Sequence, residues 1–437
     1  MTFETLGLSS ALLRALQAQG YNEPTPIQAA AIPEVLAGHD VLAAAQTGTG
    51  KTAAFTLPLL ERLFPGGQRQ NPARTTRPRA LVLVPTRELA TQVHDSLRAY
   101  ARFLTVHSTT IFGGVGMGPQ LQNLARGVDV LIATPGRLLD HLERGTAKLS
   151  GIEMLVLDEA DRMLDMGFLP ALRRILARVP QQRQTLLFSA TFATEIKTLA
   201  LNFMRQPREV QVAPANTVVA TVLHRVHPVD AERKRELLLH LINEDCRRQT
   251  LVFGRTKHGA DKLVKYLSQS GVRAAAIHGN KSQNQRTRAL ADFKNGKVQV
   301  LVATDIAARG LDIEQLPLVI NHDLPMVAED YVHRIGRTGR AGANGLAVSL
   351  VSQEESALLR AIQKLLKQDI EIAPVAGFAP AQPLRLNANG PAAPRRKPNP
   401  APGARTRRPH GQKADNQAPA SKRRSRRGRQ RMAQKPA

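Results

Sequence analysis

The chain has 437 residues, of which 42% are hydrophobic, so it can form two or three domains with substantial cores. A net charge of +26 and a pI near 11.1 favour a polyanionic partner. The single cysteine, Cys246, excludes an internal disulfide and a cysteine-based zinc site, and no apolar run approaches the ~20 residues that span a bilayer. We therefore expect a cytoplasmic protein with no membrane contact and no secretory signal at its start.

Short apolar strands alternate with helices along the first half of the chain. The predicted strands are 40–45, 80–84, 128–133, 154–157, 185–188 and 209–212. The predicted helices include 52–63, 88–104, 169–179 and a segment from Thr191 to about Met204. This alternation is typical of α/β units built on a parallel sheet.

The segment that follows the first strand is predicted to bind the phosphates of a nucleoside triphosphate. It reads Ala45-Gln46-Thr47-Gly48-Thr49-Gly50-Lys51-Thr52. Glycines let successive N–H groups point at an anion, Lys51 would reach the β- and γ-phosphates, and the Thr52 hydroxyl would coordinate Mg²⁺. The helix that follows would add its positive N-terminal end. A flexible turn with a solvated lysine is the alternative, but it leaves unexplained the acidic pair that ends a later strand.

That acidic pair, Asp158 and Glu159, directly follows the predicted strand 154–157. Ligands of α/β sheets bind beyond the carboxyl ends of the strands, and buried carboxylates are costly unless a partner or cation compensates them. We expect Asp158 to hold Mg²⁺ through water and Glu159 to orient or deprotonate the attacking water. A helix-capping role is the alternative, and it can coexist with the catalytic one.

The same alternation restarts after a small-residue break at 213–217. Strands are predicted at 250–253, 273–277, 298–303, 318–321 and 345–350, and helices at 257–269 and 284–293. This half has no Gly-Lys-Thr segment of its own, which suggests one site in a cleft that the second lobe closes. We expect a first lobe at 1–212, a linker at 213–220 and a second lobe at 221–374.

The second lobe should supply positive charge to the γ-phosphate. The segment His333-Arg334-Ile335-Gly336-Arg337-Thr338-Gly339-Arg340 fits this need, with Arg337 and Arg340 as arginine fingers. The alternative is a solvated basic helix end.

The last expected unit is a disordered basic tail at 375–437. Residues 385–437 contain sixteen Lys or Arg and one acid, Asp415, with no aromatic residue. Such a segment cannot bury enough surface to offset chain entropy. We expect it to tether RNA with little sequence preference, or, as the alternative, only to solubilise the chain.

Taken together and in this order, the motifs resemble those of the DEAD-box RNA helicases, the bacterial RhlE group above all. The resemblance covers about residues 3–378 and includes the tetrad Asp158-Glu159-Ala160-Asp161. It implies two tandem RecA-like α/β domains, with ATP and Mg²⁺ as cofactors and RNA as the partner.

The resemblance also implies roles for further residues. Phe3, Tyr21 and Gln28 match the adenine-reading motif, and Asp312 matches the ribose contact. Ser189 and Thr191 match the motif that couples hydrolysis to RNA opening. The implied RNA contacts are Pro85, Thr86, Arg87, Gly113, Gly114, Thr134, Arg137, Thr256, Gly279, Gln283, Arg286 and Thr304. Hydroxyls, backbone N–H groups and arginines suit phosphate and 2′-OH contacts, so little sequence specificity is expected.

The expected function is local, ATP-dependent unwinding of RNA duplexes or remodelling of RNA–protein complexes, coupled to RNA-stimulated ATP hydrolysis. Family analogy favours ribosome assembly or RNA turnover, with ribosomal precursors or the RNA-decay machinery as partners. One alternative is an ATP-regulated RNA clamp or chaperone that acts mainly through the basic tail. Another is a DNA helicase or translocase, which stimulation by RNA but not by DNA would exclude.

Overall fold

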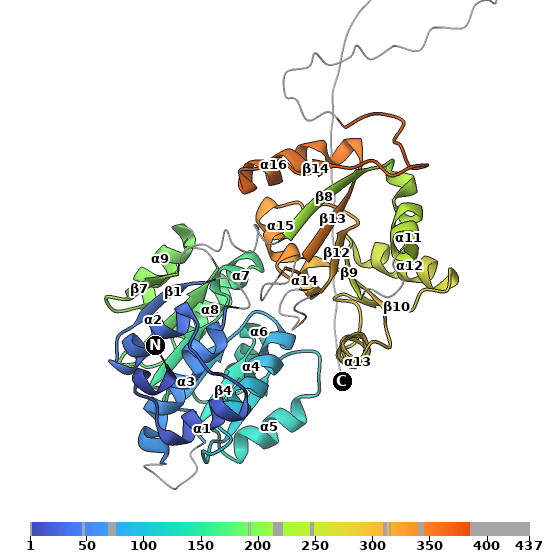
Figure 1. Cartoon of the computed structure of the whole chain (residues 1–437). Helices are drawn as coiled ribbons and strands as arrows, with labels where there is room; N and C mark the ends of the chain where they lie inside the picture. Colours follow the sequence, from blue (N-terminus) through green and yellow to red (C-terminus); the bar gives the residue numbers. More distant parts are fainter. Residues whose placement is uncertain are drawn as a thin grey trace, which may run out of the picture. The chain divides into compact units, whose positions relative to one another are not determined.

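Two parallel seven-stranded sheets follow one another along the chain (Figure 1). The computed structural model describes residues 2–45, 49–68, 76–190, 192, 194–212, 222–244, 249–308, 313, 316–339 and 345–384. We call the described residues 2–212 the first lobe and 222–384 the second lobe. The two-lobed α/β fold expected from the sequence is confirmed, whereas the expected linker at 213–220 lies outside the described residues.

The first lobe is built on a sheet with the strand order β3-β4-β2-β5-β6-β1-β7. Its strands are β1 (Val41–Ala44), β2 (Ala80–Leu83), β3 (Ser108–Ile111), β4 (Val130–Ala133), β5 (Met154–Leu157), β6 (Gln184–Ser189) and β7 (Arg208–Gln211). Leu83 pairs with both Ala133 and Leu157, so β2, β4 and β5 end in register. The segments that follow these strands therefore start at one edge of the sheet.

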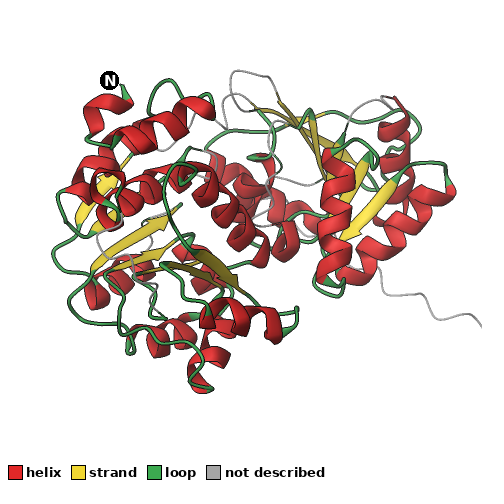
Figure 2. Cartoon of the chain, turned by 90° about the horizontal axis from the view of Figure 1, so that it is seen from below, coloured by secondary structure: helices red, strands yellow, loops and turns green. Residues whose placement is uncertain are grey.

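Helices cover both faces of this sheet (Figure 2). They are α1 (Ser10–Ala18), α2 (Pro26–Leu36), α3 (Lys51–Leu63), α4 (Arg87–Tyr100), α5 (Met117–Ala125), α6 (Pro135–Glu143), α7 (Ala160–Asp165), α8 (Leu169–Leu176) and α9 (Thr194–Phe203), with short 3₁₀ turns at Phe3–Leu6 and Pro65–Gly67. Alternate strand residues join separate cores, since Val156 packs with α1 to α4 and Leu157 packs with α6 and α8. Burial on both faces explains why the central strands read as continuous apolar runs.

The second lobe repeats the plan with the strand order β10-β11-β9-β12-β13-β8-β14. Its strands are β8 (Val222–Pro228), β9 (Thr250–Phe253), β10 (Ala274–Ile277), β11 (Val300–Ala303), β12 (Leu318–Asn321), β13 (Gly345–Val351) and β14 (Glu371–Ile372). Its helices are α11 (Lys234–Glu244), α12 (Lys257–Gln269), α13 (Gln283–Lys294), α14 (Asp305–Ala308), α15 (Ala328–Ile335) and α16 (Ser356–Leu366), with 3₁₀ turns at Ala231–Arg233 and Gln353–Glu355. None of the helices in the described part of the chain has the length and apolar character that a bilayer crossing requires.

The second lobe continues past residue 374, where the tail was expected to start. Val375 and Phe378 pack against one hydrophobic core of the lobe, and Leu384 packs against another. The Arg233 guanidinium lies 4.8 Å from the centre of the Phe378 ring, and the Ala381 N–H donates to the Asp230 carboxylate at 3.1 Å. The second lobe therefore extends at least to Leu384, and residues 385–437 lie outside the described part of the chain.

A buried charge cluster holds the loops of the second lobe together. Lys234 is 3% exposed and donates to the Glu355 carboxylate and, at 2.9 Å, to the His322 carbonyl oxygen. Arg255 Nη2 and the Leu324 N–H donate to the same carboxylate at 3.0 and 3.1 Å. Glu355 thus receives donors from three separate segments.

Replacing Glu355 with Ala should lower the free energy of unfolding by about 3 kcal/mol, because the Lys234 ammonium then stays buried without its main partner. Urea unfolding followed by circular dichroism measures the loss. The double variant Lys234→Met/Glu355→Leu removes the buried ammonium as well and should recover part of the loss, although the Leu324 N–H still lacks its acceptor. A double variant as unstable as the single one would show that shape, not charge pairing, sets the effect.

Candidate active site and RNA interface

The predicted phosphate cradle joins β1 to α3. Ala45 lies at the end of β1 and its N–H donates to the Ser189 carbonyl oxygen at 3.0 Å, while α3 begins at Lys51. Gly50 has φ of 92°, and a Cβ there would collide with the Gln28 side chain, so glycine is required at this position. Thr49, Gly50, Lys51 and Thr52 are described, whereas Gln46, Thr47 and Gly48 lie outside the described residues.

Gln28 ties the expected adenine-reading motif to the cradle. Its side chain is fully buried, its Nε2 donates to the Gly50 carbonyl oxygen at 3.1 Å, and its Oε1 accepts from the Thr25 N–H at 2.9 Å. Phe3 is also buried and meets Tyr21 edge to face at 6.4 Å. Tyr21 is 39% exposed, so it, not Phe3, presents an aromatic surface to the pocket. The adenine-reading role stays a prediction.

The acidic pair sits where β5 ends, as expected. Asp158 and Glu159 are 3% and 8% exposed, and Asp158 Oδ1 accepts from the Glu159 N–H at 3.0 Å. Glu159 has φ 52° and ψ 53°, a left-handed conformation that costs on the order of 1–3 kcal/mol for a side chain of this kind. Glu159 precedes α7, but its side chain makes no capping hydrogen bond. The Glu159 carboxylate therefore does not cap α7 and is available to bind another group.

The electrostatics around the pair fit a bound magnesium nucleotide. Burial raises the pKa of Asp158 to about 7, an effect that Lys51 partly offsets. Lys51 is 7% exposed, and its Nζ and the Glu159 Oε2 are both buried without a hydrogen-bond partner among the described residues. Buried charged atoms without partners are costly, so a phosphate beside Lys51 and Mg²⁺ beside the acids would satisfy them.

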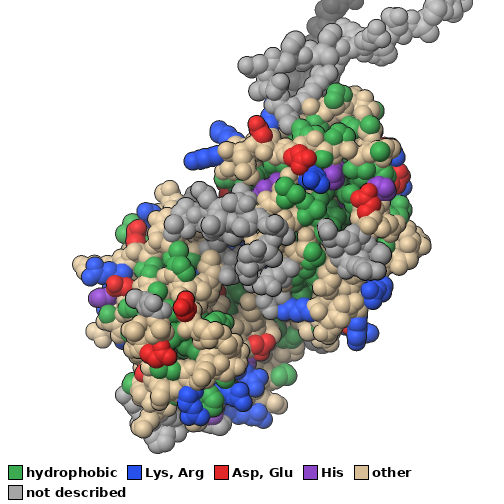
Figure 3. Space-filling view, in the orientation of Figure 1, with side chains coloured by type: hydrophobic (Ala, Val, Ile, Leu, Met, Phe, Trp, Pro, Cys, Tyr) green, Lys and Arg blue, Asp and Glu red, His purple; other side chains and the backbone are tan. Residues whose placement is uncertain are grey.

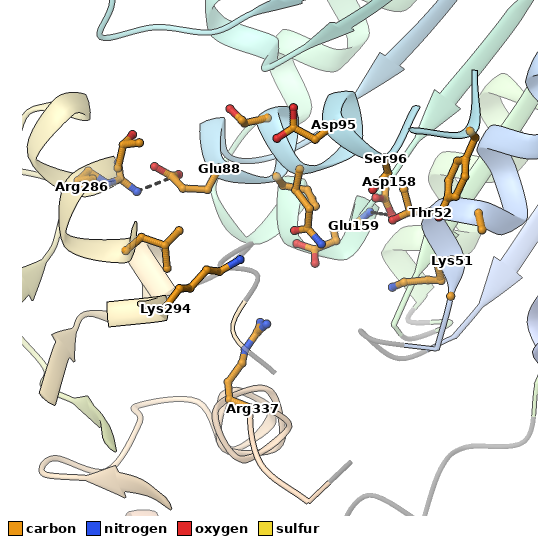
Figure 4. Close-up of a pocket in the computed structure, with 18 of the residues that line it drawn as sticks. Lys51, Thr52, Glu88, Asp95, Ser96, Asp158, Glu159, Arg286, Lys294 and Arg337 are labelled. Carbon is orange, nitrogen blue, oxygen red and sulfur yellow. Dashed lines mark hydrogen bonds and ion pairs between the residues drawn. The ribbon is translucent and has the colours of Figure 1, made fainter. Parts of the chain in front are cut away.

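Residues of both lobes line one cavity of about 510 Å³ (Figure 4). The first lobe contributes Lys51, Thr52, Asp158 and Glu159, and the second lobe contributes Arg337, which is 6% exposed. Figure 4 shows Arg337 pointing into this cavity from the second lobe. The other expected second-lobe residues, Arg340 and Asp312, lie outside the described residues.

Sequence reasoning missed several polar residues that line the same cavity. Among them are Asp95 and Tyr100 of α4 and Lys294 at the end of α13. A charged or aromatic residue on a helix carries no local signal for such a position. Only the packing of the helices reveals it.

The expected RNA contacts of the first lobe gather at the carboxyl edge of its sheet. Pro85, Thr86 and Arg87 follow β2, Gly113 and Gly114 follow β3, and Thr134 and Arg137 begin α6 after β4. Thr86 Oγ1 accepts from the Leu89 N–H at 3.2 Å and so caps α4. Gly114 has φ of 77°, and a Cβ there would overlap the Arg87 guanidinium. This glycine therefore lets Arg87 lie flat against the loop.

The second lobe places its expected RNA residues at the matching edge, with one difference. Thr256 caps α12, Gly279 follows β10 and Thr304 follows β11. Gln283 Nε2 donates to Glu88 Oε1 at 3.0 Å, and Arg286 Nη2 lies 2.9 Å from Glu88 Oε2. These two side chains, expected to face RNA, thus contact the first lobe.

The expected coupling motif meets the acidic tetrad. Ser189 is fully buried at the end of β6, and the next N–H, that of Ala190, donates to Asp161 Oδ2 at 2.9 Å. Thr191 lies outside the described residues. One hydrogen bond therefore links the strand that carries Ser189 to the tetrad.

Comparison with known proteins identifies both lobes. Residues 25–199 match the DEAD/DEAH box helicase family and residues 233–342 the helicase conserved C-terminal domain. The chain is 42% identical over 371 residues to the DEAD-box ATP-dependent RNA helicase CshA of Bacillus subtilis, covering 85% of this chain and 74% of that protein. CshA of Geobacillus kaustophilus is 42% identical over 370 residues, covering 85% and 78%.

A solved structure shows the same arrangement of elements. S. cerevisiae Dbp5 bound to RNA and ADP BeF3 matches with a TM-score of 0.76 and 32% identity, covering 85% of this chain and 95% of that one. The match extends over both lobes. The chain therefore belongs to the DEAD-box ATP-dependent RNA helicases, enzymes that bind RNA and hydrolyse ATP with Mg²⁺.

Proposed function

We propose that this enzyme unwinds short RNA duplexes locally, by closing its two lobes around ATP while it holds one RNA strand. One observation supports the proposal most directly. Lys51, Asp158 and Glu159 of the first lobe and Arg337 of the second line a single cavity, in which Lys51 Nζ and Glu159 Oε2 are buried without a hydrogen-bond partner among the described residues. Such a site is complete only when both lobes contribute, so ATP binding and lobe closure are coupled.

Each residue of the site has a proposed role in that cycle. Lys51 and the Thr49–Gly50 backbone would hold the phosphates, and Thr52 and Asp158 would hold Mg²⁺, which would offset the negative charge of the phosphates. Glu159 orients and deprotonates the attacking water. Arg337, with Arg340 and the ribose contact Asp312, brings the second lobe to the nucleotide.

The RNA-facing residues give the core its low sequence specificity. Thr86, Arg87, Thr134, Arg137, Thr256 and Thr304 offer hydroxyls and guanidiniums, which suit phosphates and 2′-OH groups. A strand bent by these contacts cannot keep its complement, and hydrolysis then reopens the lobes. Ser189 and Thr191 transmit the change through the link to the acidic tetrad.

The cellular role and the subgroup are further parts of the proposal. The motifs resemble the RhlE group, whereas the relatives reported above are CshA proteins, so we propose the bacterial DEAD-box enzymes as the wider group. RNA remodelling in the cytoplasm, in ribosome assembly or RNA turnover, is the role that family analogy favours. We propose the bounds 1–212, 213–220 and 221–384 for the two lobes and their linker, followed by a basic tail that tethers RNA.

A truncation distinguishes a helicase core from a tail-driven RNA chaperone. A chain that ends after Leu384 keeps the packing of Phe378 and Leu384 and should retain RNA-stimulated ATP hydrolysis and duplex release at saturating RNA. Its RNA affinity should fall, and the salt dependence of that affinity should become shallower, because cationic contacts are lost. Duplex release and anisotropy titrations at several salt concentrations measure both effects. Complete loss of duplex release with ATPase activity intact would favour the chaperone.

A further inference from the structure

A second cavity, of about 340 Å³, lies within the first lobe and away from the ATP site. Its lining comes from three elements. His94 and Arg98 belong to α4, His107 and Ser108 lie at the start of β3, and Asn123 and Arg126 lie at the end of α5. It therefore opens at the amino ends of β3 and β4, opposite to the edge that carries the catalytic motifs. We call it the β3 pocket.

The β3 pocket offers positive charge and hydrogen-bond donors. Arg98 and Arg126 are exposed, and no ion pair or side-chain hydrogen bond is found for either guanidinium among the described residues. No Asp or Glu is among the residues that line the pocket. Figure 3 shows Lys, Arg and His side chains gathered at the lower end of the first lobe.

The other polar groups in the β3 pocket hold its shape. His94 Nε2 shares a hydrogen bond with Ser108 Oγ at 3.1 Å, and burial lowers the pKa of this histidine. Asn123 Nδ2 donates to Thr109 Oγ1 at 3.2 Å. The nearby acid Asp129 is 1% exposed, and its carboxylate accepts a hydrogen bond from the His107 backbone N–H at 2.9 Å. Two guanidiniums over such a surface suit an oxyanion, above all a phosphate.

The elements that line the β3 pocket also lead to the expected RNA contacts. Both β3 and α5 run between the pocket and the Gly113–Gly114 loop, since β3 ends just before that loop and α5 begins just after it. At 1.5 Å per residue the nine residues of α5 span about 13 Å. That length corresponds to about four nucleotides at the ~3.4 Å spacing of a stacked strand.

We propose that the β3 pocket binds a backbone phosphate of the RNA strand a few nucleotides beyond the Gly113–Gly114 loop. Arg98 and Arg126 contact the phosphate, and the strand runs along α5 between the two sites. The assignment rests on the proposed RNA path across Gly113 and Gly114. It extends the RNA footprint of the enzyme onto the side of the first lobe.

RNA length tests the assignment in the full-length chain. Arg98→Ala/Arg126→Ala should weaken binding of an RNA of about 16 nucleotides about fivefold and reduce the slope of log affinity against log salt by about 0.7, the value for one lost phosphate contact. Binding of an RNA of about three nucleotides, which is shorter than the estimated distance between the two sites, should stay unchanged. The matched control, Arg144→Ala/Arg173→Ala, removes the same charge from exposed positions of the same lobe outside the pocket.

Two results would overturn the assignment. One is an equal loss of affinity for the short and the long RNA. The other is the same RNA affinity for the double variant and the control variant. Either result would show that the pocket makes no length-dependent contact with RNA. Equilibrium dialysis with inorganic phosphate distinguishes an RNA phosphate from free phosphate as the ligand. If the pocket served free phosphate, the parent chain would bind inorganic phosphate, the double variant would not, and RNA binding would be the same in both. Duplex release by the parent chain is measured separately, so failure of the proposed unwinding activity would be recognised independently.

Discussion

Glu159→Gln should bind ATP no more weakly than the parent enzyme and lose RNA-stimulated ATP hydrolysis by a factor of about 10²–10⁴. The amide keeps the shape of the side chain but cannot accept a proton from the attacking water. Glu159 Oε2 is buried and has no hydrogen-bond partner among the described residues, so the substitution breaks no bond in the resting structure. Removing one of two adjacent negative charges also favours the phosphates.

Single-turnover hydrolysis and equilibrium binding of ATP, each with and without RNA, separate the two effects. Glu153→Gln is the matched control, because Glu153 is an exposed acid just before β5 that pairs with Arg79 at 2.6 Å. It should hydrolyse ATP at the parental rate. Near-normal turnover by Glu159→Gln would assign the base to another group.

The left-handed backbone at Glu159 sharpens this expectation. A residue at φ 52° is held there by its surroundings, here by the end of β5 and the start of α7. Glutamine tolerates this conformation as poorly as glutamate does, so the substitution changes the chemistry and not the backbone. The thermal midpoints of Glu159→Gln and the parent chain should therefore agree within a few degrees.

The central strands could be predicted from the sequence because both of their faces are buried. Strands β5, β9 and β12 match the predicted ranges, and each contains at least three consecutive apolar residues. The edge strand β3 was missed, since its sequence Ser108-Thr109-Thr110-Ile111 is mostly polar and half of it is only partly buried. An edge strand has one free side, and its sequence carries less of the buried-strand pattern.

Some residues of the candidate site could be predicted from the sequence and others could not. Motifs local to one strand end, such as Asp158-Glu159, could be placed from the sequence, because the carboxyl edge of a parallel sheet is where such groups gather. Contacts that depend on packing could not. The hydrogen bond of Gln28 to Gly50 and the contact of Glu88 with Arg286 join segments whose spacing along the chain says nothing about their distance in space.

Arg337→Ala should slow RNA-stimulated hydrolysis by about 10³-fold while the first lobe still binds ATP within a few-fold of the parent affinity. The Arg337 side chain lines the ATP cavity, and its backbone carbonyl oxygen accepts from the Leu316 N–H at 3.0 Å, a bond that the substitution keeps. Arg337→Lys retains a charge but not the planar fork, so it should recover only part of the loss. Arg360→Ala, an exposed arginine of α16, is the control and should behave as the parent.

The neighbouring Arg334 shows why the result would be specific to catalysis. Arg334 is 2% exposed, donates to both oxygens of Asp305 at 2.6 and 2.8 Å, and reaches Asn321 Oδ1 at 3.0 Å. Arg334→Ala should therefore destabilise the second lobe strongly, whereas Arg337→Ala should destabilise it less. If instead Arg337→Ala lowered the unfolding midpoint as much as Arg334→Ala, the loss of activity would follow from misfolding. If Arg337→Ala stayed folded and kept parental hydrolysis, Arg337 would not act on the phosphates.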